Sequence, residues 1–313
     1  MVEANVIGDG IYTPVTTFYK DDYELDLDAQ VKHANFLYDN GISGVLLSGS
    51  IGEAIHLNRD ERLSLVKAVR DAIPDKNFRI ISGLPYSNIK DSILEIDLVK
   101  KAGGDFAILL VPGFYGSNLT HQQGIIDYFT RIADQATLPI LIYHYPGVSN
   151  NLNVEPETFK ALSKHPKIVG VKLTHFNLDN YILLAANKAE NAANNFKPVT
   201  GLGQILIPAL SVGVFGAIDG LSGIFPKVMV HLHKLFKEGR QDEGLELQYL
   251  VTKADRLILN LNLAGVKHAL YVLYGFGNKN VSGRPPLNNL IDDKTWAKYE
   301  PDFKKLSEIE SSL

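Results

Sequence analysis

The hydrophobic pattern of the chain alternates between two kinds of segment. Short runs of apolar and β-branched residues, the pattern of strands buried on both faces, are separated by longer stretches with apolar residues at helical spacing. The short runs lie at residues 10–18, 42–48, 78–84, 105–112, 138–146, 167–173, 197–201 and 213–219. Eight strand patterns that alternate with helical ones predict parallel strands joined by crossover helices.

Polar residues at the ends of the helical stretches predict where helices begin. Asn58 and Glu61 have the spacing of a capping box ahead of an apolar helical face, and Thr120 and Gln123 repeat this spacing. Pro156 stands near the start of another helical stretch, where its missing N–H group costs nothing. We therefore expect helices that begin just after Asn58 and Thr120 and close to Pro156.

Two architectures fit such an alternation, an open doubly wound sheet and a closed (β/α)8 barrel. Eight strands favour the barrel, and GLGQIL at Gly201 lacks the last glycine of the G-x-G-x-x-G phosphate fingerprint. After Gly223 the pattern becomes helical, and no Pro- or Ser-rich linker separates this part. The sequence predicts an α/β fold: a (β/α)8 TIM barrel, residues 8–223, with a C-terminal helical region, residues 224–313, packed on the barrel.

Composition and charge narrow the classes of partner. The 313 residues are 45% hydrophobic with a net charge of −4 and no concentration of Lys and Arg, so we expect small-molecule partners, no nucleic acid and no membrane. The absence of cysteine excludes disulfides, thiolate nucleophiles and cysteine-based metal sites. The first residues have neither a basic start nor a long apolar run, which predicts no signal peptide and a cytoplasmic protein.

Three reactive features follow the ends of predicted strands, where barrel enzymes place their active sites. Lys172 ends the sixth strand, Tyr143 ends the fifth, and the turn Gly49–Glu53 follows the second. A lysine forms an imine with a ketone when its amine is neutral, and burial among apolar residues lowers the lysine pKa toward neutrality. The alternative is that Lys172 only ends a strand and extends its amine into water.

Tyr143 and the turn also allow two interpretations each. A phenol can donate and accept a proton, whereas aromatic residues at strand ends commonly serve packing. Consecutive backbone N–H groups of the turn can bind a carboxylate or phosphate, although glycine turns also occur without a ligand. The sequence has no H-E-x-x-H, no P-loop and no Asp/Glu/His cluster at ligand spacing, so we expect no metal and no cofactor.

The order of these motifs resembles the family of pyruvate-dependent class I aldolases and synthases that includes dihydrodipicolinate synthase and N-acetylneuraminate lyase. The resemblance covers residues 8 to 290, and its most specific part is a Y-x-x-P motif followed by G-x-K about thirty residues later. The motifs are GIYTPVTTF, GSIGEAIHL, LIYHYPG, VGVKLT and GAIDGLSG. The resemblance implies a (β/α)8 barrel with C-terminal helices, usually tetrameric, that forms a Schiff base with pyruvate or another 2-keto acid.

The resemblance also assigns roles by position. Lys172 would form the imine, Tyr143 would be the general acid and base, and Ser50 would relay protons and help to hold the keto-acid carboxylate. In the family an aromatic residue of the neighbouring subunit often completes the relay, and Tyr115, beside Phe114, is the matching residue. The substrate-binding positions expected with them are Gly49, Ile51, Gly52, Thr174, His175, Gly201 and Asp219.

Two positions depart from the family pattern. Ile51 stands where many members have Thr or Asn, so a polar side chain near the carboxylate is lost while the backbone N–H groups remain. Such a hydrogen bond is worth about 0.5–1.5 kcal/mol, which weakens binding without abolishing it. Val148 stands about where dihydrodipicolinate synthases carry an arginine for the carboxylate of aspartate semialdehyde, which argues against that synthase activity.

VKLTHFN and AGVKHALYVLYGFG are most similar to fungal aldolases that cleave 2-keto-3-deoxy sugar acids to pyruvate and a hydroxyaldehyde. We expect Thr174, His175 and Asp219 to hydrogen-bond a polyol tail, with the Asp219 charge disfavouring a second carboxylate. The alternative for Asp219 is a cap on the following turn. The alternative functions are a 4-hydroxy-2-oxoglutarate aldolase, a sialic-acid-type lyase, dihydrodipicolinate synthase and a non-catalytic keto-acid-binding protein.

Overall fold

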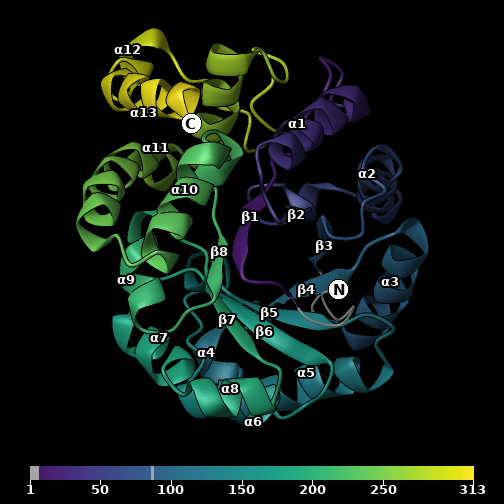
Figure 1. The fold of residues 1–313 in the computed structure, drawn as a ribbon. Helices are drawn as coiled ribbons and strands as arrows, with labels where there is room; N and C mark the ends of the chain where they lie inside the picture. The colour runs from purple at the N-terminus through teal and green to yellow at the C-terminus, as the bar shows by residue number, and fades with distance from the viewer. Residues whose placement is uncertain (1–6, 86–87) are drawn as a thin grey trace.

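A computed structural model describes residues 7–85 and 88–313 and contains a closed barrel of eight parallel strands (Figure 1). Each strand pairs with the next in sequence, and β1 closes the barrel against β8. The predicted (β/α)8 fold is confirmed, with all eight strands inside the predicted runs. They are β1 (Gly10–Pro14), β2 (Gly44–Leu47), β3 (Arg79–Leu84), β4 (Phe106–Leu110), β5 (Ile140–His144), β6 (Ile168–Leu173), β7 (Lys197–Thr200) and β8 (Gly216–Ile218).

Helices follow the strands and form the outer layer. The helices through residue 211 are α1 (Leu27–Asp39), α2 (Arg59–Ala72), α3 (Ile89–Ala102), α4 (Gly116–Leu119), α5 (Gln122–Gln135), α6 (Pro156–Ser163), α7 (Leu178–Ala185), α8 (Lys188–Ala193) and α9 (Leu206–Ser211). Single 3₁₀ turns lie at η1 (Ala54–His56), η2 (Pro146–Val148), η3 (Gly203–Ile205) and η4 (Leu221–Gly223).

Two of the three predicted helix starts are confirmed. Asn58 and Glu61 form the capping box of α2, and α6 begins at Pro156. The start after Thr120 is wrong by one residue: Thr120 ends α4 through its backbone N–H, which donates to Gly116, and His121 precedes α5 without a side-chain cap. The apolar pattern did not indicate the short helix α4. Thr120, which resembled the N-cap of the next helix, is instead the C-cap of α4.

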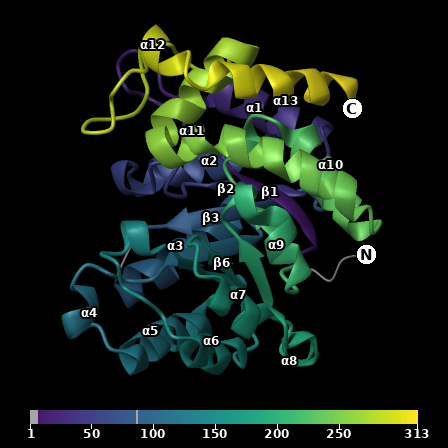
Figure 2. The same cartoon turned by 90° about the vertical axis from the view of Figure 1, so that its left-hand side faces the viewer.

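The C-terminal region consists of α10 (Pro226–Lys237), α11 (Gln241–Tyr274), α12 (Asp293–Trp296) and α13 (Glu300–Ser312). Figure 2 shows these helices gathered at one end of the molecule. The helix α10 packs against β1 and η4, and α11 packs against η3 and η4. The C-terminal helices therefore pack directly on the barrel.

The long helix α11 is broken at Asn262, whose φ of 50° and ψ of −138° are not helical. By length and composition, α11 is the one helix among the described residues that resembles a membrane span. Its side chains nevertheless bond to barrel loops, through Gln248 to Gly203 and through Lys267 to Glu53. One side of this helix therefore packs on the barrel. Residues 1–6, on which the signal-peptide prediction partly rests, lie outside the described residues.

The strands are apolar on both faces because both faces are covered. One cluster of side chains fills the barrel, and two larger clusters lie between the strands and the surrounding helices. All six residues of β6 are buried, and Lys172 is among them with 3% of its surface exposed. Burial in such a strand disfavours the charged form of the Lys172 amine because the charge loses its hydration.

Candidate active site

Lys172 and Tyr143 are direct neighbours on adjacent strands. They are paired in the register of β5 and β6, and Nζ of Lys172 lies 4.5 Å from the centre of the Tyr143 ring. Both side chains are almost fully buried, with 3% and 5% exposed. The strands place them at the carboxyl-end mouth of the barrel, where the sequence predicted that they would meet.

The environment of Lys172 favours a neutral amine. Burial lowers its pKa to about 7, and the nearby Asp219 carboxylate opposes part of that shift. About half of the amines are then unprotonated at neutral pH, whereas an exposed lysine is almost wholly protonated there. A neutral lysine amine is a nucleophile that can add to a ketone.

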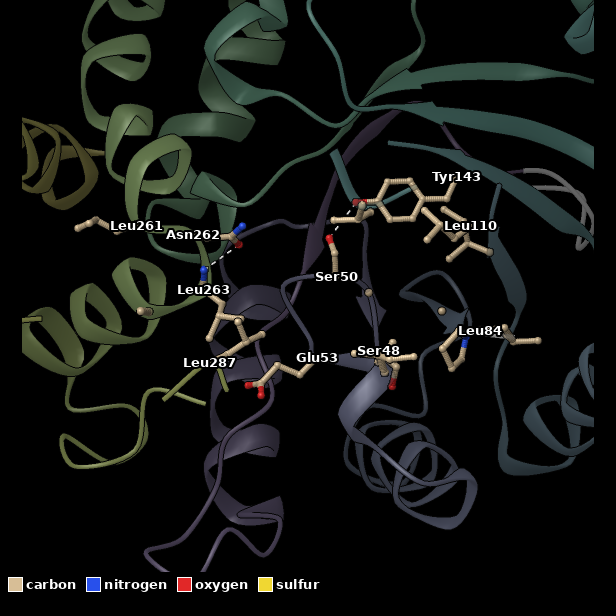
Figure 3. A pocket seen from close by; sticks show the side chains of 18 of the residues that line it. Ser48, Ser50, Glu53, Leu84, Leu110, Tyr143, Leu261, Asn262, Leu263 and Leu287 are labelled. Atoms are coloured by element: carbon tan, nitrogen blue, oxygen red, sulfur yellow. Dashed lines mark hydrogen bonds between the residues drawn. The ribbon is translucent and has the colours of Figure 1, made fainter. Parts of the chain in front are cut away.

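Ser50 connects the turn after β2 to Tyr143. Its Oγ lies 2.9 Å from the Tyr143 hydroxyl, and either atom can be the donor (Figure 3). Burial raises the pKa of Tyr143, and the hydrogen bond to Ser50 offsets part of the rise. The pair therefore holds a phenol close to the lysine amine, with a hydroxyl positioned to pass a proton to it or from it.

The turn after β2 presents free backbone donors beside this pair. Within the described part of the chain, no protein group accepts a hydrogen bond from the backbone N–H of Ser50 or of Ile51. Gly52 brings the turn against the residue that follows β1, since a Cβ there would lie 2.9 Å from the Val15 carbonyl oxygen. These two N–H groups are the donors that would hold the carboxylate predicted for this turn.

Glu53 anchors the turn to the C-terminal region. It has a left-handed backbone (φ 56°), and its fully buried carboxylate accepts hydrogen bonds from Lys267 Nζ at 2.7 Å and from the Arg284 backbone N–H at 2.9 Å. Nδ1 of His56 lies 3.2 Å from the same carboxylate. Lys267 and Arg284 also lie over the face of the Tyr19 ring. The shape of this turn therefore depends on residues more than two hundred positions away in sequence.

Two cavities meet at the Ser50–Tyr143 pair. A small cavity of about 90 Å³ contains Lys172, and a larger one of about 590 Å³ extends between the barrel loops and the C-terminal region. Ser50, Tyr143 and Asn262 line both cavities. Figure 3 shows Asn262 facing this junction from the break in α11. The lysine is thus reached through a cavity whose wall includes the C-terminal helix.

The structure places four of the seven predicted substrate-binding residues in the walls of these cavities. Gly49 lines the larger cavity, and Ile51, Thr174 and Gly201 line the smaller one. A Cβ on Gly201 would lie 3.0 Å from Cε of Lys172, so glycine leaves space for the lysine stem. Gly52 lies behind the turn and lines neither cavity.

His175 and Asp219 lie outside both cavity walls. The His175 ring packs against the rings of His144 and Tyr181, and burial lowers its pKa to about 4. Oδ1 of Asp219 accepts a hydrogen bond from the Ser222 backbone N–H at 3.0 Å, which is the turn-capping arrangement. Burial raises the pKa of Asp219 to about 6, and Asp219 acts on Lys172 through its charge.

Tyr115 is on the outer surface. It precedes α4 with 69% of its surface exposed, beside Phe114 with 82% exposed, and it lines neither cavity. The rings of Tyr115 and Phe114 pack edge to face, with centroids 5.2 Å apart. This placement leaves Tyr115 without contact to Lys172 of its own chain and available to a second molecule.

Four polar residues that line the smaller cavity were not singled out from the sequence: Tyr145, Gln204, Asp255 and Asn262. Tyr145 was visible as the third residue of the Y-x-x-P motif. Asp255 and Asn262 come from α11, and no local pattern indicates which face of that helix meets the barrel mouth. Among the described residues, no group of three or more His, Asp or Glu is arranged to hold a metal ion.

Comparison with known proteins gives a consistent assignment. The sequence profile of the dihydrodipicolinate synthetase family matches residues 8–300. An Emericella nidulans protein named "Probable 4-hydroxy-2-oxoglutarate aldolase, mitochondrial" is 32% identical over 86% of this chain and 87% of its own length. The L-threo-3-deoxy-hexylosonate aldolase of Hypocrea jecorina is 28% identical over 97% of this chain and 98% of its own length.

The fold has close counterparts among solved structures. Dihydrodipicolinate synthase from Thermotoga maritima superposes with a TM-score of 0.88 at 24% identity, over 96% of this chain and 99% of that one. The profile match spans nearly the whole chain and includes Lys172 and Tyr143 on their strands and Ser50 in the turn after β2. The chain belongs to the dihydrodipicolinate synthetase family, as its sequence motifs predicted.

Proposed function

We propose that this protein is a class I aldolase that cleaves a 2-keto-3-deoxy sugar acid to pyruvate and a hydroxyaldehyde. The observation that carries the proposal is the buried Lys172 amine, with a pKa of about 7, beside the hydrogen-bonded pair of Tyr143 and Ser50. The aldolase names of the similar fungal proteins support the reaction class.

The reaction begins with imine formation. The neutral amine of Lys172 adds to the C2 ketone while the backbone N–H groups of Ser50 and Ile51 hold the C1 carboxylate. The phenol of Tyr143 gives its proton to the departing hydroxyl group, so that water leaves and a protonated imine and a Tyr143 phenolate form. The imine carries a positive charge close to the Tyr143 ring. This charge stabilises the phenolate and so offsets the rise that burial causes in the pKa of Tyr143.

Cleavage then uses the imine as the electron acceptor. The Tyr143 phenolate, whose oxygen accepts a hydrogen bond from Ser50, takes the proton of the C4 hydroxyl. The C3–C4 bond breaks, the aldehyde leaves, and the bonding electrons neutralise the imine nitrogen as an enamine. Protonation of the enamine at C3 and addition of water release pyruvate and restore the free amine. The reverse sequence joins pyruvate to an aldehyde.

The cavity walls favour a hydroxylated tail over a second carboxylate. Within residues 7–85 and 88–313, Lys172 is the one cation that lines either cavity, and no arginine does. Val148, at the position discussed for the synthase arginine, contributes an alkyl group to the wall of the larger cavity. A tail carboxylate would lose water without gaining a partner, which disfavours dihydrodipicolinate synthesis and makes 4-hydroxy-2-oxoglutarate the poorer substrate.

The test is release of pyruvate, coupled to lactate dehydrogenase, from a 3-deoxy-hexulosonate and from 4-hydroxy-2-oxoglutarate. We expect the sugar acid to have the higher kcat/KM. A higher kcat/KM for the dicarboxylate would transfer the assignment to 4-hydroxy-2-oxoglutarate aldolase. Binding of pyruvate without turnover of either compound would support the non-catalytic keto-acid-binding protein instead.

We propose further that the protein works as a homotetramer in which Tyr115 of one copy completes the proton relay of its neighbour. The exposed pair of Phe114 and Tyr115 supports this placement. Mixing inactive Tyr115→Phe subunits with inactive Lys172→Ala subunits tests it, because a shared site in hybrids regains Lys172 from one chain and Tyr115 from the other. Hybrids that stay inactive would contradict the proposal.

The cytoplasmic location is likewise a proposal that rests on the sequence pattern alone. Imaging of the tagged chain in cells tests it, and accumulation in mitochondria would contradict it.

A further inference from the structure

The barrel-facing side of α11 carries a stripe of three polar residues, Gln248, Thr252 and Asp255, at helical spacings of four and three. All three bond to the segment that follows β7. Nε2 of Gln248 donates to the Gly203 carbonyl, Thr252 Oγ1 donates to the Gln204 carbonyl at 2.8 Å, and Oδ2 of Asp255 accepts from the Gln204 backbone N–H at 3.0 Å. These three side chains hold α11 against η3 by hydrogen bonds.

Asp255 differs from the other two because it also lines the cavity that contains Lys172. It is 4% exposed, and Gln204 and Thr174 are polar neighbours in the same wall. Gln248 and Thr252 do not line this cavity. Among the described residues Asp255 accepts one hydrogen bond, at Oδ2, which leaves its Oδ1 without a partner in the wall of this cavity.

We propose that Asp255 is a specificity-determining residue, which binds a hydroxyl group on the aldehyde-derived part of a 2-keto-3-deoxy sugar acid. This inference rests on the proposed aldolase function and adds to it the residue that selects the tail. It also moves the tail contact from Asp219, which caps η4 behind the cavity wall, to a carboxyl group that lines the cavity.

The electrostatics of the two carboxyl groups fit this role. Burial raises the pKa of Asp255 to about 8, and the carboxylate of Asp219 adds to the rise. At neutral pH the Asp255 carboxyl is mostly protonated, so it can both donate a hydrogen bond to a substrate hydroxyl and accept one from Gln204. The charge of Asp219 behind the wall would repel a tail carboxylate, and Lys172, the one cation that lines either cavity among the described residues, is engaged in the imine.

Three variants separate substrate selection from simple anchoring of the turn. Asp255→Leu removes the polar group, Asp255→Asn keeps a donor and an acceptor of the same size, and Thr252→Val removes a neighbouring anchor that does not reach the cavity. The quantity measured is the ratio of kcat/KM for a 3-deoxy-hexulosonate to kcat/KM for 4-hydroxy-2-oxoglutarate. Borohydride trapping of pyruvate on Lys172 serves in each variant as the measure of an intact imine site.

We expect Asp255→Leu to lower the ratio about tenfold or more, Asp255→Asn to keep it within about threefold, and Thr252→Val to leave it unchanged, since a site built for a hydroxyl discriminates strongly when its polar group is lost. Should the leucine variant fail to fold, Asp255→Ala is used with the same expected fall. An unchanged ratio in a variant that still traps pyruvate would overturn the inference, as would an equal fall in Thr252→Val. Wild-type protein that traps no pyruvate would instead overturn the proposed function itself.

Discussion

Nζ of Lys172 lies 4.5 Å from the centre of the Tyr143 ring, because the two residues are paired across β5 and β6. The barrel thus fixes a nucleophile and a proton carrier by strand register, without dependence on a flexible loop. The phenol hydroxyl reaches in turn to Ser50 at 2.9 Å. Preorganised contacts of this kind reduce the entropy that the reaction must lose on reaching its transition state.

Imine formation should depend on pH through Lys172. Its pKa of about 7 means that roughly one tenth of the amine is neutral at pH 6 and roughly nine tenths at pH 8. The initial rate of trapping with pyruvate should therefore rise about ninefold from pH 6 to pH 8 and then level off. Quenched-flow borohydride trapping gives this profile, and a rate that keeps rising toward pH 10 would indicate an ordinary, solvated lysine.

The charge of Asp219 should set the position of that profile. This carboxylate raises the pKa of Lys172 against the effect of burial, so Asp219→Asn should move the acid limb to lower pH. Asparagine can still accept the hydrogen bond from the Ser222 backbone N–H. The control is Thr13→Val, which removes the hydroxyl bonded to Ser222 in the same turn but removes no partner of Asp219, and should leave the profile in place. Equal shifts in both variants would assign the effect to turn geometry.

Lys172 should reduce the stability of the fold. Its folded-state pKa, about 7, lies below the ordinary value of 10.5, so the unfolded chain binds more protons between these pH values and stability rises with pH across this window. Lys172→Met should raise the free energy of unfolding at pH 7 by up to roughly 4–5 kcal/mol, an advantage that shrinks toward pH 10. Urea unfolding of both proteins tests this, with the exposed Lys164→Met as control; a less stable Lys172→Met protein at pH 7 would contradict it.

The buried ion pair of Lys267 and Glu53 should control binding of the keto-acid carboxylate. Lys267→Met leaves the Glu53 carboxylate buried without its cation, which should destabilise the fold by about 3–5 kcal/mol and raise the pyruvate concentration needed for half-maximal trapping. Adding Glu53→Gln removes the unpaired charge and should recover part of the stability. Unfolding and trapping curves on the single and double variants test this, and an unchanged pyruvate requirement in a destabilised Lys267→Met protein would limit the pair to a structural role.

The sequence was sufficient for the barrel and for the residues at strand ends. Buried parallel strands give continuous apolar runs, and a lysine or tyrosine that ends such a run has its direction set by the strand. Residues that act across long sequence distances gave no such signal. Asp255 and Asn262 reach the cavity only because of how α11 packs on η3, and His175 turns away because its loop packs on His144 and Tyr181.

The central claim is that Lys172 forms an imine with the keto acid. Incubation with pyruvate, reduction with borohydride and peptide mass mapping test it directly. The account predicts a reduced pyruvate adduct on the peptide that contains Lys172, and no adduct in Lys172→Ala. Wild-type protein without an adduct, or with the adduct on another lysine, would contradict the account.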